Sequence, residues 1–323
     1  MTQKIDFGNV ITAMVTPFKK GGQLDLDSTE FLANHLLKNG TDTLLLIGST
    51  GEAAQLSPEE KWNIVKRIRA FTPKETKILV ATGDTNTKRA ILKTKKAFQL
   101  GADGVLVTVP EYIKPPQSAL IQHFSAIADS IPDKPMIIYN IPSRTGTEIL
   151  PDTVATLAKS HPNIVGIKQS YGNMDKVSEL KEKCPADFQI YSGDDSLTLP
   201  MLSLGAKGVI SVASHLEGNL IQTMIQSFKK GNVLKAQELH GLLFPLYKSL
   251  FMTTNPLPIK EALYQRQLID SPMLRTLGEM SPVDKNLLQK NLSEFYMRKN
   301  DYILKQNKIN KLAILKTEKG GKL

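Results

Sequence analysis

The chain has 323 residues, of which 41% are hydrophobic and 22% charged, so it can bury a large core. No apolar run approaches the 18 residues of a membrane span. A single cysteine, Cys184, excludes an internal disulfide framework and favours a reducing, cytoplasmic location, and the N-terminus has no signal-peptide pattern. The net charge is +10, but +6 of it lies in residues 298–323, where one arginine and seven lysines stand against two acids, so we do not expect the body of the protein to bind nucleic acid.

Eight short apolar segments alternate with segments of helical periodicity along most of the chain. This alternation predicts a (β/α)8 TIM barrel, with a doubly wound open sheet as the alternative. An open sheet usually carries a glycine-rich phosphate loop after its first strand, and Val15-Thr16-Pro17-Phe18 is no such loop. The predicted strands are residues 10–16, 43–47, 77–82, 104–108, 135–140, 164–168, 188–192 and 208–212.

Helical patterns continue after the eighth strand. They predict the last barrel helix and then a C-terminal helical appendage, with helices at 220–230, 233–252, 256–266 and 282–299. We therefore divide the chain into a catalytic barrel (1–230), a C-terminal helical region packed on the barrel (231–299) and a basic tail (300–323). The tail is interpreted as either a basic amphipathic helix or a disordered segment.

Several residues have the pattern of helix starts. Ser57-Pro58-Glu59-Glu60 combines an N-cap, a proline in the first turn and two early acids. Asn86 is a further candidate cap, and we interpret Asp194 and Asp195 as turn and N-cap residues. No cluster of histidines and acids with ligand spacing accompanies these two aspartates, so we expect no metal.

Lys168 ends the apolar strand 164–168, at the side of a barrel where active sites lie. Burial at this position disfavours the ammonium and lowers the pKa of a lysine. A neutral amine can attack a ketone and form a Schiff base, which then acts as an electron sink. The alternative is a structural lysine whose amine extends from the rim to water.

Other strand ends carry polar side chains that suit the same chemistry. Gly48-Ser49-Thr50-Gly51-Glu52 follows the second strand, where hydroxyls and free N–H groups can hold a carboxylate. Tyr139 offers a phenol for proton transfer, and Arg144 offers a fork that matches a carboxylate. Taken singly, they could be a turn, a core aromatic and a surface ion-pair partner. Together with Lys168 they predict one active site at the rim.

Several motifs occur in a fixed order and carry a family resemblance: Gly48-Ser49-Thr50-Gly51-Glu52, Tyr139-Asn140-Ile141-Pro142, Gly166-Ile167-Lys168, Ser192-Gly193-Asp194, Gly208-Val209-Ile210-Ser211 and Asn255-Pro256-Leu257-Pro258-Ile259-Lys260. In these motifs the chain, from about residue 8 to about residue 292, resembles the dihydrodipicolinate synthase and N-acetylneuraminate lyase family. The tail beyond residue 299 has no counterpart in this pattern.

The resemblance implies a lyase of the class I aldolase type. Such an enzyme condenses pyruvate with L-aspartate 4-semialdehyde to 4-hydroxy-tetrahydrodipicolinate, in lysine and diaminopimelate biosynthesis. It implies a Schiff base of pyruvate on Lys168, with no further cofactor. It also implies a homotetramer built as a dimer of dimers.

The resemblance further implies a role for each site residue. Tyr139, Ser49 and Tyr112 form a proton relay, and Tyr112 reaches in from a neighbouring subunit. Thr50 holds the pyruvate carboxylate with the backbone around it, and Gly193 and Ile210 add backbone contacts. Arg144 binds the carboxylate of the aldehyde.

Two alternatives remain open from the sequence. A pyruvate-dependent sugar-acid aldolase, such as an N-acetylneuraminate lyase, shares the Schiff-base lysine but typically lacks the residue matched by Arg144. The other alternative is a barrel that has lost catalysis and binds a pyruvate-like ligand, or a polyanion through its basic tail. Two departures bear on the site, because Ser49 replaces a threonine of the relay and Glu111 stands where many synthases have a second tyrosine.

The resemblance also points to an effector pocket for lysine near a subunit interface. The matching positions combine small residues with two cations, and they are Ala53, Ala54, Pro58, Lys61, Thr85, Arg89 and Glu111. Lys61 and Arg89 would repel the ammonium of a lysine effector. We therefore predict an enzyme without lysine feedback.

Overall fold

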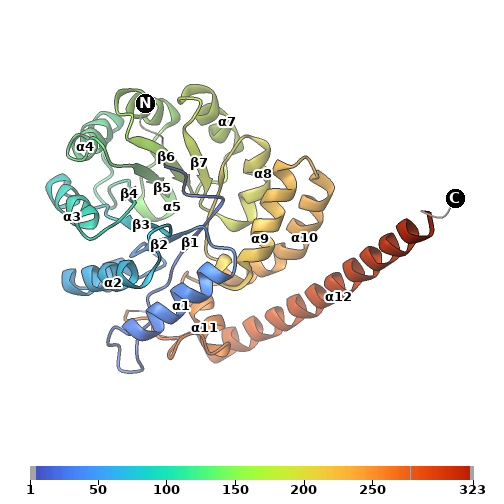
Figure 1. The fold of residues 1–323 in the computed structure, drawn as a ribbon. Coiled ribbons are helices and arrows are strands. Elements are labelled where there is room, and N and C mark those ends of the chain that lie inside the picture. The colour runs from blue at the N-terminus through green and yellow to red at the C-terminus, as the bar shows by residue number, and fades with distance from the viewer. Residues whose placement is uncertain (1–4, 277, 321–323) are drawn as a thin grey trace.

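Eight parallel strands close into a barrel in the order of the sequence, as predicted (Figure 1). The structure is a computed structural model that describes residues 5–276 and 278–320, and of residues 309–320 it describes the backbone alone. The strands are β1 Val10–Ala13, β2 Thr43–Leu46, β3 Lys77–Ala81, β4 Gly104–Thr108, β5 Met136–Asn140, β6 Ile164–Gln169, β7 Gln189–Ser192 and β8 Gly208–Ser211.

Helices surround the barrel and continue into a C-terminal group (Figure 1). The α-helices are α1 Leu26–Lys38, α2 Pro58–Phe71, α3 Thr87–Gln99, α4 Gln117–Asp129, α5 Pro142–Thr145, α6 Pro151–Ser160, α7 Met174–Lys183, α8 Thr198–Ser203, α9 Ser214–Lys229, α10 Val233–Leu250, α11 Leu257–Gln265 and α12 Pro282–Gly320. Two 3-10 turns, η1 Ala53–Gln55 and η2 Asp195–Leu197, lie in the loops after β2 and β7. None of the described helices combines the length and the apolar character needed to cross a membrane.

Local capping begins several of these helices where the sequence predicts it. Ser57 and Glu60 form a reciprocal capping box at the start of α2. Asn86 accepts a hydrogen bond from the Arg89 N–H at the start of α3. These polar side chains satisfy N–H groups that the first helical turn leaves without partners.

The prediction for Asp194 and Asp195 needs correction. Asp194 is the N-cap residue of η2, but its side chain makes no capping hydrogen bond there. The buried Asp195 carboxylate instead accepts hydrogen bonds from the Ser211 hydroxyl and from the N–H groups of Val212 and Ala213. Burial raises the pKa of Asp195, and these hydrogen bonds act against that shift. The side chain therefore ties the end of β7 to the end of β8.

The strands separate two apolar cores, one between the barrel and its helices and a smaller one inside the barrel. Side chains alternate between these two cores along a strand, because successive residues point to opposite faces. The inner core contains Ile137 and Tyr139 of β5, Val165 of β6 and Tyr191 of β7. Residues in line with them at the strand ends face the mouth of the barrel.

A β-bulge interrupts this alternation in β6. Met136 pairs with Ile164, but the next residue of β5, Ile137, pairs with Gly166, so Val165 is an extra residue. The pairing then continues in step and places Lys168 opposite Tyr139 on the inner face. A Cβ on Gly166 would overlap the Gln189 carbonyl oxygen of β7, so a glycine suits this bulge. If β6 alternated regularly from Val165 without this bulge, Lys168 would point toward the helices.

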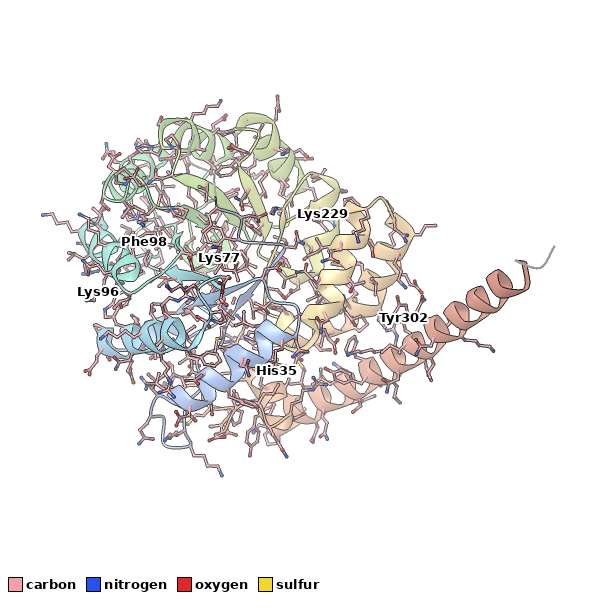
Figure 2. All side chains as sticks on the ribbon, viewed as in Figure 1. His35, Lys77, Lys96, Phe98, Lys229 and Tyr302 are labelled. Carbon is pink, nitrogen blue, oxygen red and sulfur yellow. The ribbon has the colours of Figure 1, made fainter. Side chains whose placement is uncertain are left out.

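The C-terminal helices pack on one side of the barrel. The last barrel helix begins at Ser214 rather than at residue 220, and residues 300–320 continue α12 as a helix. Lys299 of α12 forms an ion pair with the buried Glu217 at 2.7 Å, and Lys235 of α10 donates a hydrogen bond to the Tyr302 hydroxyl. Figure 2 shows Tyr302 on α12. Figure 1 shows the far half of α12 extending away from the barrel. The division into three domains stays a prediction.

The fully buried His215 predicts a pH-dependent stability. Its Nδ1 donates to the Val212 carbonyl and its Nε2 accepts the Val15 N–H, so the ring is neutral. Burial lowers the pKa of His215 from its ordinary value of 6.5 to about 4. As the pH falls from 6.5 to 4, His215 becomes protonated in the unfolded chain but stays neutral in the folded chain. We expect this residue to remove about 3 kcal/mol of stability over that range.

Urea denaturation at several pH values tests this expectation. The loss of unfolding free energy between pH 7 and pH 4.5 should be smaller in His215→Gln than in the wild type, because glutamine does not titrate. His161→Gln, in which a half-buried histidine is replaced, serves as the matched control. An equal loss in wild type and His215→Gln would contradict the assignment.

Candidate active site

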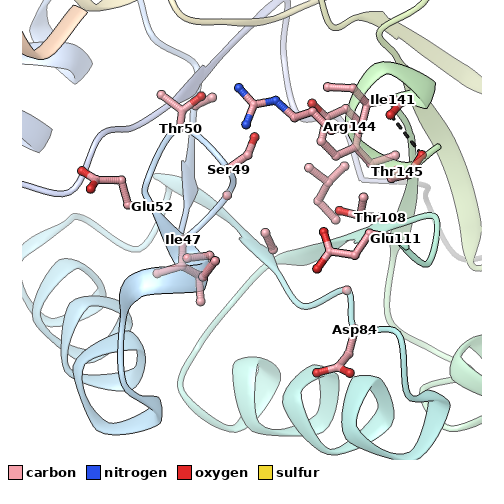
Figure 3. Close-up of a pocket in the computed structure, with 18 of the residues that line it drawn as sticks. Ile47, Ser49, Thr50, Glu52, Asp84, Thr108, Glu111, Ile141, Arg144 and Thr145 are labelled. Carbon is pink, nitrogen blue, oxygen red and sulfur yellow. Dashed lines mark hydrogen bonds between the residues drawn. The ribbon is translucent and has the colours of Figure 1, made fainter. Parts of the chain in front are cut away.

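A cavity of about 700 Å³ opens at the C-terminal ends of the strands (Figure 3). Five of the eight predicted site residues line it, namely Ser49, Thr50, Tyr139, Arg144 and Lys168. They come from the end of β2 and its loop, from β5 and the helix after it, and from β6. The structure therefore brings most of the predicted rim together in one place.

Lys168 and Tyr139 form the floor of this cavity. Lys168 is only 6% exposed, and its Nζ lies 4.3 Å from the centroid of the Tyr139 ring. This contact follows from the register of β5 and β6, which pairs the two residues directly. Burial raises the pKa of the nearby Asp194, and the charge of Lys168 acts against that shift. A buried amine beside a phenol suits covalent chemistry with proton transfer.

The loop of residues 48–52 is held in a constrained shape. Ile47 and Glu52 at its two ends have positive φ angles of 51° and 55°, which are uncommon for residues other than glycine. The Thr16 hydroxyl donates to the Gly51 carbonyl at 2.7 Å. Such a conformation persists only where surrounding contacts hold it.

A buried ion pair fixes Glu52. Lys260 of α11 is fully buried and donates to Glu52 Oε1 at 2.7 Å, and the Arg275 N–H donates to Glu52 Oε2 at 3.3 Å. Lys260 Nζ also donates to the carbonyls of Thr16 and Met273, at 3.1 and 2.8 Å. Burial lowers the pKa of Lys260, and the Glu52 carboxylate acts against that shift. The C-terminal region thus holds the loop that carries Ser49 and Thr50.

Asn255 connects two of the predicted substrate-binding residues. Its side-chain amide donates to Thr50 Oγ1 at 2.9 Å, and its backbone carbonyl accepts from Arg144 Nη2 at 3.2 Å. All three residues line the cavity. Sequence reasoning did not assign Asn255, Glu52 or Lys260 a role in the site. The signal was present, because all three lie within the motifs that carry the family resemblance.

Arg144 lies on the short helix α5, directly after β5. Asn140, the last residue of β5, points away from the barrel interior, where its Oδ1 accepts the Ile149 N–H at 3.3 Å and so fastens the far end of the same loop. Figure 3 shows the guanidinium of Arg144 directed across the cavity toward Ser49 and Thr50. A carboxylate placed in this gap would meet the fork of the arginine.

Three predicted residues do not line the cavity. Tyr112 is 90% exposed, with a positive φ of 71°, and it lies in a neighbouring surface depression with Arg144. Ile210 is fully buried in the inner core. Gly193 directly follows β7 and lies beside Lys168, because a Cβ there would lie 3.1 Å from Lys168 Cε. The predicted roles of these three residues stay predictions.

The cavity has a second, charged arm formed by α2, α3 and the loop after β3. Burial alone would raise the pKa of Asp84, but hydrogen bonds from Arg89 and Lys93 bring it below its ordinary value. Arg89 lies 2.9 Å and Lys93 2.6 Å from this carboxylate. Burial lowers the pKa of Lys61 in the same arm, and the charge of Lys93 adds to that shift. The Asp84 carboxylate is therefore already engaged by two cations.

The side chains that line the cavity include an amine, groups that can carry protons and groups that can bind a carboxylate. The part of the chain that the structure describes contains no group of three or more histidines, cysteines or acids placed to hold a metal ion. An amine, a phenol, two hydroxyls and a guanidinium suit a keto acid that forms an imine with Lys168.

The comparisons agree with this geometry. The pattern of the dihydrodipicolinate synthetase family matches residues 6–295. A 4-hydroxy-tetrahydrodipicolinate synthase of Nostoc punctiforme is 50% identical over 258 residues, which cover 80% of this chain and 87% of the relative. The crystal structure of DHDPS from Cyanidioschyzon merolae with lysine bound has a TM-score of 0.87 at 40% identity, over 90% of this chain and 98% of that one. A dihydrodipicolinate synthase from Aquifex aeolicus has a TM-score of 0.86 at 40% identity, with the same coverage.

The Glu52–Lys260 pair leads to a prediction about stability. Lys260→Met leaves the Glu52 carboxylate buried without its partner, so we expect the free energy of unfolding to fall by about 3–5 kcal/mol. The double variant Glu52→Gln with Lys260→Met removes both charges and should recover part of this loss. A double-mutant cycle by urea denaturation measures the coupling. Additive losses in the two single variants would contradict a direct interaction.

Proposed function

Because the chain belongs to the dihydrodipicolinate synthetase family, we propose that it is a lyase that condenses pyruvate with L-aspartate 4-semialdehyde to 4-hydroxy-tetrahydrodipicolinate. This reaction belongs to lysine and diaminopimelate biosynthesis. The observation that carries the proposal is Lys168, buried on the inner face of the barrel against Tyr139 in a cavity that Arg144 also lines.

The first half of the reaction activates pyruvate. The Lys168 amine attacks C2 of pyruvate, the ketone oxygen leaves as water, and an iminium remains. Loss of a proton from the methyl group then gives an enamine, because the iminium accepts the electron pair. Tyr139 stands over the amine and passes these protons, with Ser49 as the next hydroxyl of the relay. Thr50, held by Asn255, receives the pyruvate carboxylate.

The second half joins the two substrates. The enamine carbon attacks the aldehyde carbon, and the aldehyde oxygen takes up a proton to become a hydroxyl. Arg144 orients the aldehyde through its carboxylate, since a guanidinium fork matches that group. The amino group of the same substrate then attacks the iminium carbon, which closes the ring and releases Lys168. No step needs a metal or an organic cofactor.

Tyr112 supports the proposal of a shared site in a homotetramer. Its side chain is 90% exposed on a loop next to the Arg144 depression, and its φ of 71° is strained for a tyrosine. A neighbouring copy of the chain would cover this ring and receive it in the relay.

Gly193 and Ile210 supply backbone contacts to the pyruvate end. We place the enzyme in the cytoplasm.

A pyruvate-dependent sugar-acid aldolase is not favoured. It would use the same Lys168 and Tyr139, but it has no need of an arginine at the mouth of the cavity. Arg144 is held by the Asn255 carbonyl and directed toward Ser49 and Thr50, as expected of a residue that binds the second substrate (Figure 3).

Consumption of pyruvate in the presence of aspartate semialdehyde tests the proposal. We expect Lys168→Ala to lower kcat by at least about 10³-fold, because the variant has no amine for the imine. Arg144→Gln should lower kcat/KM for the aldehyde by roughly 10- to 100-fold, since one charge-assisted pair is lost. Arg144→Lys is the matched control that keeps the charge without the fork.

The outcomes separate the two candidate activities. Cleavage of N-acetylneuraminate by the wild type, with aspartate semialdehyde left untouched, would reverse the choice of acceptor and keep Lys168. Retention of full activity in Lys168→Ala would remove the Schiff-base mechanism altogether.

The charged arm of the cavity predicts the response to lysine. Asp84 is already engaged by Arg89 and Lys93, and Lys61 adds a further cation, so a lysine ammonium meets repulsion there. We expect millimolar lysine to leave the steady-state rate unchanged, with the same concentration of alanine as the control. Strong inhibition by sub-millimolar lysine would contradict this expectation.

A further inference from the structure

Ser170 carries a buried hydroxyl that has no hydrogen-bond partner among the described residues. The residue is 8% exposed and lies two positions after Lys168, just beyond the end of β6. A buried hydroxyl without a partner is costly, so such a group calls for an explanation. No step of the proposed reaction described above uses the Ser170 hydroxyl.

The strand register places Ser170 directly above Lys168. The Ser170 N–H donates to the Asn140 carbonyl, and the Gly193 N–H donates to the Gln169 carbonyl, so the ladders of β6 continue past the strand end. Side chains alternate along a strand, so Ser170 points inward as Lys168 does. Its polar atom therefore faces the interior rim of the barrel and not the surrounding helices.

Gly193 brings the hydroxyl and the lysine together. A Cβ on this residue would overlap Ser170 Oγ and would lie 3.1 Å from Lys168 Cε. Ser170 Oγ thus occupies the space that a side chain on Gly193 would fill, and Lys168 Cε borders the same space. Ser170 itself does not line the cavity, and its hydroxyl borders the Lys168 chain at Gly193.

We propose that the Ser170 hydroxyl accepts a hydrogen bond from the N–H of the Lys168 Schiff base. In the free enzyme Lys168 Nζ lies against the Tyr139 ring, and the absence of a side chain at Gly193 lets Ser170 Oγ lie beside the Lys168 chain, toward which the nitrogen turns when it becomes an iminium. The hydrogen bond stabilises the charged iminium relative to the free amine and fixes the plane of the C=N bond. The inference rests on the proposed function and adds a catalytic residue to it.

Trapping with borohydride in pyruvate alone tests this role, because the aldehyde takes no part. Borohydride reduces the iminium to a stable secondary amine, and intact-protein mass spectrometry gives the trapped fraction with time. We expect Ser170→Ala to be trapped about tenfold more slowly, as expected for one hydrogen bond to a charged group. Ser170→Thr keeps the hydroxyl and should restore trapping. Ser178→Ala, on the exposed face of α7, is the matched control.

Thermal unfolding of the same variants separates catalysis from structure. Removal of an unpartnered hydroxyl should leave the Tm of Ser170→Ala unchanged or higher, while trapping falls. Trapping at the wild-type rate would overturn the proposal, and so would a fall in trapping accompanied by a lower Tm.

Different outcomes would overturn the proposed function and the proposed role of Ser170. Absence of any pyruvate adduct on the wild type would overturn both the proposed function and the role of Ser170. A trapped adduct, slowed in Ser170→Ala, together with no turnover of aspartate semialdehyde, would overturn the acceptor alone and support the role of Ser170.

Discussion

The extra residue in β6 is the constraint on which the active site depends. One inserted position, Val165, turns every later side chain of the strand to the opposite face, so Lys168 enters the barrel and Ile167 joins the outer core. Gly166 suits the bulge because a side chain there would overlap the backbone of β7. An irregularity of one residue thus turns into the barrel a lysine that would otherwise face the helices.

The cavity above this lysine is assembled from segments far apart in the chain. Its loop after β2 is fixed by Lys260 of α11, and the two side chains that we propose to bind substrate, Thr50 and Arg144, meet at Asn255. The buried Glu52–Lys260 pair is no argument for high stability by itself, since desolvation offsets much of the attraction. It fixes a strained loop in one shape, and that preorganisation is what carboxylate binding requires.

Sequence patterns predict the parts of this protein that follow local rules. The alternating strands and helices, the Ser57 and Asn86 caps and the strand-end positions of Lys168 and Tyr139 could all be identified without the fold. The inward orientation of Lys168 could not be derived, because plain alternation from Val165 gives the opposite face. Asp195 was misread because a cap is a local feature, whereas its carboxylate binds the end of another strand. The lack of a partner for the Ser170 hydroxyl, and its position next to Gly193, depend on the three-dimensional fold and cannot be predicted from the sequence.

The late position of Lys260 and Asn255 in the chain has a consequence for biosynthesis. Ribosomes add roughly 5–20 residues per second, and the N-terminal part of a chain folds first. All eight strands, with Lys168 among them, leave the ribosome before the segment that supports the loop of residues 48–52. The nascent barrel therefore leaves Lys168 in an unfinished cavity for several seconds. Because the supporting contacts follow all eight strands in the chain, the cavity cannot be completed until α11 has been synthesised.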